Sequence, residues 1–319
     1  VALDVLGTSS FTMVADVASA YRAGPGFLVG DAAHRMTPYA GAGLNTAVHD
    51  GHELGWRLAW VARGIAGDAL LSGYAAEREP VGRVNAVRSL STERHPDDGL
   101  PRDLGGTYRS AVIVDDGAAP ATGHHRTARP GERAPHAWFR KDGRRRTTLD
   151  LFDGRMTVLA GPDGQWEEFP GSSPLREVRQ DHERATPAER PHPGHAAGGR
   201  PHPGDAPEGR PDHKRATPGG RPDHKRATPG GRQHGRREPG EPEWLSVDGV
   251  PVAVLRVGRD LPDPRGVIRR AYRLGPDSTV LVRPDGVVAW RHDGPSDPAA
   301  LVSAVRTAVG RAVPAAGAV

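Results

Sequence analysis

One segment near the start of the chain constrains its fold more than any other. A short apolar run, residues 27–29, is followed at once by Gly30 and Asp31 and then by a glycine-rich stretch, 41–45. The next residues, 46–63, have the spacing of an amphipathic helix. This order predicts a buried strand that ends in an acidic residue, then a loop that leads into a helix. The carboxylate could accept hydrogen bonds from hydroxyl groups, and the glycines let backbone N–H groups approach an anionic ligand.

The rest of the first hundred residues predicts further helices around this unit. We expect the first long helix over 44–63, with apolar positions that include Leu44, Val48 and Leu58, and with Gly64 just after its end. A short helix is expected at 16–21 and a strand at 26–30. Asp68 is expected to cap a second helix that reaches about Arg78, and Pro80 to begin a third that reaches about Leu90.

The pattern changes after a poorly periodic stretch at 92–130. Strands are expected at 147–152, 156–160 and 251–257, and a helix at 265–272. A hairpin is expected around Pro284, Asp285 and Gly286, with strands 279–283 and 287–291, and a final helix at 298–313. The order strand, strand, helix, hairpin, helix is that of a thioredoxin-like domain.

Composition excludes several classes of protein. The chain of 319 residues has no cysteine, which excludes disulfides, thiolate metal sites and cysteine nucleophiles, and which fits a cytoplasmic protein. No run approaches the roughly 20 apolar residues of a membrane span. The hydrophobic fraction is 36%, which is low for a chain that is packed throughout.

The net charge of +4 arises in one low-complexity segment. Residues 181–240 hold 12 Lys and Arg against 8 Asp and Glu, so the rest holds 43−12 = 31 basic and 39−8 = 31 acidic residues. Within it, residues 210–220 recur unchanged as 221–231. The units lack the apolar side chains needed to offset chain entropy, so we expect a disordered loop. It has no aromatic residue for base stacking, and we expect no specific nucleic-acid partner.

The first segment resembles the second FAD-binding motif of the FAD-dependent aromatic-ring and polyketide hydroxylases, the flavoprotein monooxygenases that include para-hydroxybenzoate hydroxylase. The matching residues are Gly30-Asp31-Ala32-Ala33-His34, then Pro38, then Gly41-Ala42-Gly43-Leu44-Asn45. The likeness continues through 49–59 and 70–81. It implies an α/β fold in which the C-terminal part of an FAD/NAD(P)-binding domain is followed by a thioredoxin-like domain with a disordered insertion.

The resemblance also implies roles for the motif residues. Asp31 would contact ribitol or ribose hydroxyls of FAD, and Pro38 would lie against the flavin ring. The loop residues would offer backbone N–H groups to the flavin N1–C2=O edge; they are Gly41, Ala42, Gly43, Leu44 and Asn45. His34 would be structural rather than catalytic, and no catalytic side chain is assigned. Packing and surface ion pairing would explain Glu53, Trp56 and Arg57.

The implied domains are a flavin part at 1–95, a linker at 96–129, and a thioredoxin-like domain at 130–169 and 242–315 that is interrupted by the insertion 170–241. Without cysteine the second domain could not do dithiol chemistry, so we expect a packing or dimerisation role. The scattered histidines between 124 and 234 have no metal-ligand spacing, and we expect no metal site.

The implied activity is that of an FAD-dependent monooxygenase. NAD(P)H would reduce FAD, and a flavin C4a-hydroperoxide formed with O2 would hydroxylate a small aromatic or polyketide substrate. In the family a further glycine-rich unit precedes this motif, so the chain is expected to be N-terminally truncated. It could form a homodimer. The alternative is a non-catalytic fragment that acts at most as a dimerisation or scaffold module. FAD binding discriminates between the two.

Overall fold

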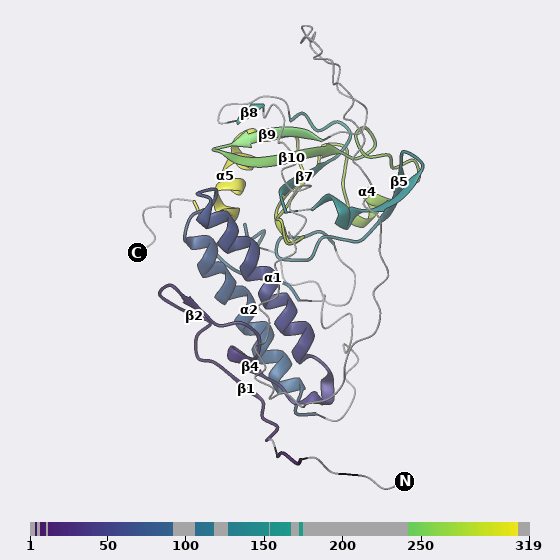
Figure 1. Ribbon diagram of the computed structural model, residues 1–319. Coiled ribbons are helices and arrows are strands. Elements are labelled where there is room, and N and C mark those ends of the chain that lie inside the picture. The colour runs from purple at the N-terminus through teal and green to yellow at the C-terminus, as the bar shows by residue number, and fades with distance from the viewer. Residues whose placement is uncertain are drawn as a thin grey trace, which may run out of the picture. The chain divides into compact units, whose positions relative to one another are not determined.

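Two long helices and a six-stranded sheet dominate the computed structural model (Figure 1). The helices are α1 (Gly43–Ala62) and α2 (Ala69–Arg88), which pack against each other. The described residues, which all fall within one compact unit, are 4, 7–10, 12–91, 106–117, 127–152, 154–166, 172–174 and 242–311. Among these residues no helix is long and apolar enough to cross a membrane.

Short strands precede the helix pair and replace the helix expected at 16–21. β1 (Asp16–Val17) pairs antiparallel with β4 (His34–Arg35), and β2 (Arg22–Ala23) pairs with β3 (Gly26–Phe27). The guanidinium of Arg35 donates to the carboxylate of Asp16 across the first pair. This tertiary pairing overrides the local pattern, and the strand expected at 26–30 is limited to two residues.

Helix α1 begins and ends close to the predicted positions, but its buried face was predicted wrongly. Gly64, at a φ of 70°, donates its N–H to the carbonyl of Val61 and so ends the helix. Leu44 and Val48 are 76% and 62% exposed. The buried side is largely polar and comprises Thr46, Asp50, Glu53, Leu54, Arg57 and Trp60.

Helix α2 is one helix where the sequence predicted two. Pro80 lies inside it instead of beginning a new helix. The two residues at 77 and 78, just before the proline, are buried and ion-paired on this helix. Proline disfavours the helical conformation of the residue before it and removes one hydrogen bond of the helix. The buried ion pairs of residues 77 and 78 keep this part of α2 helical.

The sheet has the strand order β12-β11-β7-β10-β9-β8. Its strands are β7 (Met156–Ala160), β8 (Ser172–Pro174), β9 (Glu243–Val247), β10 (Val250–Arg256), β11 (Thr279–Val282) and β12 (Val288–His292). β7 and β10 are parallel, and the other neighbours are antiparallel. With α4 (Val267–Tyr272) between β10 and β11, and α5 (Pro298–Ala308) after β12, the order β12-β11-β7-β10 is the thioredoxin-like arrangement.

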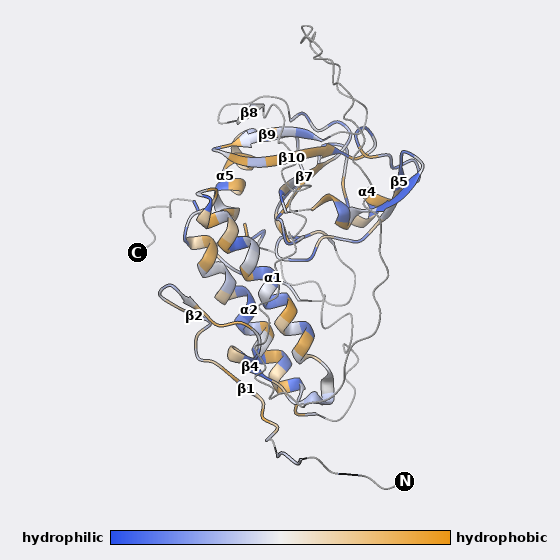
Figure 2. Ribbon diagram, viewed as in Figure 1, coloured by the Kyte–Doolittle hydropathy of each residue, from blue (hydrophilic) through white to orange (hydrophobic). Residues whose placement is uncertain are grey.

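Both faces of the sheet are buried in apolar side chains. Alternate residues of β7 contribute to different clusters: Met156 and Val158 pack on the side that includes residues of α5, and Leu159 on the side that includes residues of α4. Figure 2 shows β7 and β10 as largely hydrophobic, whereas α1 and α2 alternate between hydrophobic and hydrophilic. Two buried faces require near-continuous hydrophobic strands, which is why this part was predictable from the sequence.

A hairpin and a 3-10 turn precede β7. β5 (Trp138–Lys141) pairs with β6 (Arg144–Thr147), and η3 (Thr148–Leu151) replaces most of the strand expected at 147–152. A capping box causes this: Leu149 N–H donates to Oγ1 of Thr147, and Thr147 N–H donates to Asp150. Apart from β8, the predicted insertion at 170–241 lies outside the described residues.

Besides the apolar cluster that Trp60 and Leu70 share with the sheet, polar contacts among the described residues join the helix pair to the C-terminal part at two places. At one, the loop between α1 and α2 reaches the end of α5, where Gly67 N–H donates to the carbonyl of Val309 at 2.8 Å. A Cβ at Gly67 would lie 2.3 Å from the carbonyl oxygen of Gly310, so only glycine permits this approach. At the other, the turn between β11 and β12 joins the helices through buried charges.

Candidate cofactor-binding site

The loop that carries the predicted acidic residue is folded against α1. Gly30, the first residue of η1 (Gly30–Ala32), has a φ of 60°, and its N–H donates to Oδ2 of Asp50 at 3.2 Å. A Cβ at Gly30 would lie 3.1 Å from the Cβ of Ala47, so glycine suits both the backbone and the close contact. Asp31 is exposed, and its carboxylate accepts no hydrogen bond within the described part of the chain.

Asp50 is the buried hub beneath this loop. Besides Gly30, it binds Nε2 of His34 at 2.7 Å and Nε of Arg78 at 2.8 Å. Burial by itself would raise the pKa of Asp50, but the hydrogen bond from His34 and the charge and hydrogen bond of Arg78 outweigh it and hold that pKa below its ordinary value. An ionised Asp50 therefore ties the loop to both helices.

His34 has the structural position that the resemblance implied. Its side chain is fully buried, and Nε2 contacts the carboxylate of Asp50 rather than solvent. Sequence reasoning did not single out Asp50 and Arg78 as its partners. Asp50 lies on the inward side of α1 and Arg78 on that of α2, and only the packing of the two helices reveals that these charged residues turn inward.

The start of α1 is open. Its N-cap residue is Ala42, which has no side-chain cap hydrogen bond, and the first turn has no acidic side chain. The first N–H groups of a helix have no partner within the helix, and the N-terminal end of the helix dipole favours negative charge. Leu44 and Asn45 are exposed in this turn. Such an N-terminus fits an electron-rich or anionic group.

Buried hydrogen bonds hold this helix start in place. Oγ1 of Thr46 donates to the carbonyl of Ala42 at 2.8 Å and accepts from Nδ2 of Asn85 on α2 at 3.0 Å. The preceding turn η2 (Pro38–Ala40) is tied to α2 as well, because Thr37 N–H donates to Oγ of Ser89 at 3.0 Å. The loop and the helix start are therefore positioned by the same two helices.

The structure brings the predicted cofactor-binding residues together around the start of α1. The exposed ones are Asp31, Pro38, Gly41, Leu44 and Asn45, whereas Gly30 and Ala42 are buried and Gly43 is half-buried. The exposed members offer the carboxylate of Asp31, which has no partner among the described residues, and an uncapped helix N-terminus; Leu44 adds apolar surface. This donor and acceptor set fits a ligand such as FAD, which has hydroxyl groups, an electron-rich ring edge and an apolar ring.

The surface ion pairs expected of Glu53 and Arg57 are buried instead. Both side chains are at most 4% exposed, and Arg57 pairs with Glu53 at 2.6 Å and with Glu77 at 2.5 Å. Arg283 and Asp285, from the turn after β11, complete the group. The helical spacing of Asp50, Glu53 and Arg57 could have indicated that they share one buried face of α1. Arg283 and Asp285, which pack against that face, lie more than two hundred residues further along the chain, so the sequence did not indicate them.

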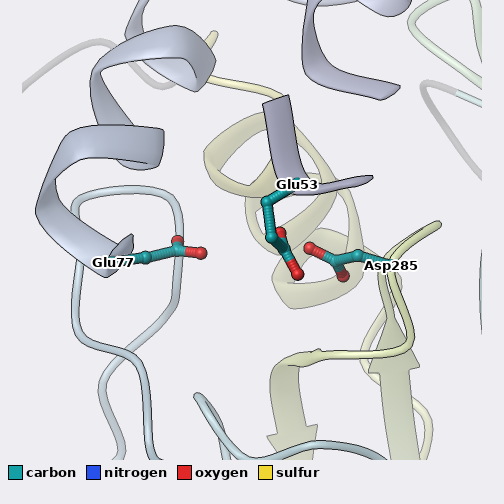
Figure 3. A group of neighbouring side chains, drawn as sticks. All are labelled: Glu53, Glu77 and Asp285. Atoms are coloured by element: carbon teal, nitrogen blue, oxygen red, sulfur yellow. The ribbon is translucent and has the colours of Figure 1, made fainter. Parts of the chain in front are cut away.

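In the described part of the chain, one group of side chains has the composition of a metal site, namely Glu53, Glu77 and Asp285 (Figure 3). Their carboxylate oxygens lie within 4.8 Å of one another. Arg57 and Arg283 donate to these carboxylates, so two positive charges already occupy the place of a cation. The group is a buried ion-pair cluster.

Comparisons with known families match both ends of the chain. Residues 1–89 match the model of the FAD binding domain, and residues 242–312 match that of the aromatic-ring hydroxylase C-terminal region. Aklavinone 12-hydroxylase DnrF of Streptomyces peucetius is 40% identical over 54% of this chain and 38% of its own length. The 4-methyl-5-nitrocatechol 5-monooxygenase of a Burkholderia species is 32% identical over 97% of this chain and 48% of its own length.

Solved structures give the same result. A crystal structure of aklavinone-11 hydroxylase with FAD and aklavinone matches with a TM-score of 0.63 and 27% identity, over 93% of this chain and 46% of that one. The chain thus spans less than half the length of each of these relatives.

Proposed function

Because the chain is a relative of the FAD-dependent aromatic-ring and polyketide hydroxylases, we propose that the loop and helix start at residues 30–45 bind FAD and that the protein serves the hydroxylation of an aromatic or polyketide compound. FAD would supply the redox chemistry, with NAD(P)H as reductant and O2 as the source of oxygen. The relatives named above act on aklavinone and on a nitrocatechol, which favours a substrate of that polycyclic or phenolic class.

Each predicted residue has a distinct part in this proposal. Asp31 accepts hydrogen bonds from sugar-type hydroxyls of the cofactor. The first N–H groups of α1 face the electron-rich edge of the flavin ring, where negative charge develops on reduction. Pro38 lies against the ring. Asp50 contacts no ligand and instead holds Gly30 and His34, so that Asp31 faces outward.

The observation that carries the proposal is that one scaffold holds both an exposed carboxylate and a helix N-terminus without a side-chain cap. Asp31 is an exposed carboxylate with no partner among the described residues, and it lies on a loop that Asp50 ties to α1, the helix whose N-terminus is uncapped. Asp50, His34 and Arg78 form a buried network that holds this loop with Asp31 facing outward. Such a network is costly to bury, and a role of Asp31 in ligand binding accounts for it.

The proposed domain division follows the two matched regions. The flavin part is 1–95, the linker 96–129, the insertion 170–241, and the thioredoxin-like domain the remainder to residue 315. The two family models fall within the first and last of these. Because the sequence has no cysteine, the thioredoxin-like domain contributes packing, not dithiol exchange.

FAD binding by the full chain tests this function. We expect added FAD to acquire a protein-perturbed absorbance spectrum, and Asp31→Ala to weaken the affinity about 10- to 100-fold, since hydrogen bonds to a charged group contribute about 1.5–3 kcal/mol. Asp277→Ala is the matched control, because Asp277 is also exposed but lies in the C-terminal part. A folded chain that leaves the FAD spectrum unchanged would contradict the proposal and favour a scaffold role.

A further inference from the structure

A cluster of buried charges joins three separate parts of the fold. Glu53 and Arg57 come from α1, Glu77 from α2, and Arg283 and Asp285 from the turn between β11 and β12. Figure 3 shows the three carboxyl groups pointing toward one another from these elements. All five side chains are at most 4% exposed. Little water therefore contacts these side chains to stabilise any excess charge.

The charges in the cluster do not balance. Three carboxyl groups face two guanidinium groups, so full ionisation would leave one buried negative charge without a counter-charge. An uncompensated buried charge is costly, and a buried acid in such a place keeps its proton. The charge count alone thus calls for one bound proton among the three carboxyl groups.

Two of the three carboxylates are saturated with donors. Glu77 accepts from Arg57 at 2.5 Å, twice from Arg283 at 2.8 Å, and from Oγ of Ser110 at 2.6 Å. These four donated hydrogen bonds favour the ionised form of Glu77 over the protonated form. The positive charges lower the pKa of Glu77 below its ordinary value, although burial opposes them.

Asp285 is saturated in the same way. Its carboxylate accepts from Arg283 at 2.6 and 3.2 Å and from the N–H of Val287 at 3.0 Å. Burial would raise its pKa, but Arg283 and Arg57 lower it to about 2. Asp285 is therefore the ionised member of any pair that it forms with a neighbouring acid.

Glu53 is the carboxyl group that is left. Among the described residues it accepts from one donor, Arg57, and its other contact is the carboxylate of Asp285. Burial and the nearby charge of Asp285 raise the pKa of Glu53 to about 8. Two carboxylates in contact repel each other unless one of them is protonated.

We propose that Glu53 is protonated in the folded protein and donates a hydrogen bond to Asp285, so that the joint between α1 and the C-terminal sheet contains a bound proton and weakens as the pH rises. The proton comes from solvent when the chain folds and returns there when Glu53 ionises. No other group changes its charge in this step, and the inference does not depend on FAD binding.

The surroundings of Glu53 allow this exchange. A cavity of about 300 Å³ borders both Glu53 and Asp285 and gives the proton a route that does not require unfolding. The charged and titratable groups around Glu53, in the cluster or along the cavity, are Arg57, Glu77, Arg283, Asp285, His49, His52, Arg78, Tyr108 and Arg133.

Proton linkage tests the inference. In the unfolded chain Glu53 titrates near 4.5, so between about pH 5 and pH 8 the folded state binds one proton more than the unfolded state. The contribution of Glu53 to stability is complete below its unfolded-state pKa of 4.5 and is lost as the pH rises toward its folded-state pKa of about 8. We expect urea unfolding of Glu53→Gln, which keeps a donor for Asp285 but cannot ionise, to lack this loss. The ratio of its unfolding constant to that of the unaltered chain should fall about tenfold per pH unit.

The matched control is Glu79→Gln on the outer side of α2, where Glu79 forms an exposed pair with Arg83. Its ratio should stay constant over the same pH range. A ratio that is also constant for Glu53→Gln would overturn the proposal. If that variant does not fold, carbon NMR of the unaltered chain labelled at glutamate carboxyl carbons decides: one buried glutamic acid signal at pH 6.5 that shifts by pH 9 supports the proposal, and no such signal overturns it.

Discussion

The helix pair and the C-terminal sheet bury side chains of opposite chemistry. The inward side of α1 and α2 has five ionised or ionisable residues, all at most 3% exposed: Asp50, Glu53, Arg57, Glu77 and Arg78. All five residues of β7 are buried, and only Thr157 among them is polar. An apolar interior requires the right volume and pattern, whereas a charged interior also requires each partner at a particular place.

The buried charges lie where the helix pair must hold something else in position. Asp50 and Arg78 lie beneath the loop that presents Asp31, and the cluster around Glu77 lies beneath the turn that carries Asp285. Hydrogen bonds and ion pairs are directional, so they fix the orientation of a loop in a way that hydrophobic contact does not. The charged interior thus contributes positioning, at a cost in desolvation.

The largest expected effect comes from breaking the charge cluster without changing its shape. Glu77→Gln keeps the volume but replaces the buried carboxylate that accepts from both Arg57 and Arg283 with a neutral amide, and we expect a loss of about 3–5 kcal/mol in the free energy of unfolding. Leu159→Met, an equally conservative change in the sheet, should cost less than about 1.5 kcal/mol. Urea denaturation of the two variants measures both. Equal losses would contradict the contrast between the two interiors.

Low pH should destabilise the helix pair before the sheet, with a smaller loss of stability than Glu77→Gln causes. The pKa values of Asp50, Glu77 and Asp285 are lowered in the folded state, each against an opposing effect of burial. Their contribution is complete above the ordinary values of 3.8 to 4.5 and is lost as the pH falls below them toward the folded-state values, at about 1.4 kcal/mol for each unit of lowering.

We therefore expect α1 and α2 to lose hydrogen-exchange protection at a higher pH than β7 and β10 during acid titration. Mass spectrometry of deuterium uptake, corrected for the intrinsic exchange rate at each pH, would give the order directly. Earlier or simultaneous loss in the sheet would show that the buried charges do not set the acid limit.

The same contrast explains what the sequence could predict. The strand at 156–160, the hairpin around Gly286 and the motif from Gly30 to Asn45 follow local patterns, and the structure contains all three. The continuous helix through Pro80 and the burial of Arg57 depend on contacts that have no local trace. Arg283 lies 206 residues from Glu77 along the chain, and no periodicity links them.

The smallest expected effect concerns the two sides of the helix pair. Gly55 is exposed in the middle of α1, and a Cβ there would have no atom within 4 Å, so Gly55→Ala should stabilise the protein by about 0.5–1 kcal/mol. Gly82 faces inward on α2, where a Cβ would lie 2.0 Å from the hydroxyl oxygen of the buried Tyr21. Gly82→Ala should therefore cost about 1–3 kcal/mol despite the same gain in helix propensity. Thermal unfolding of the pair compares them, and a stabilised Gly82→Ala would mean that the inward side of α2 is looser than the contact with Tyr21 indicates.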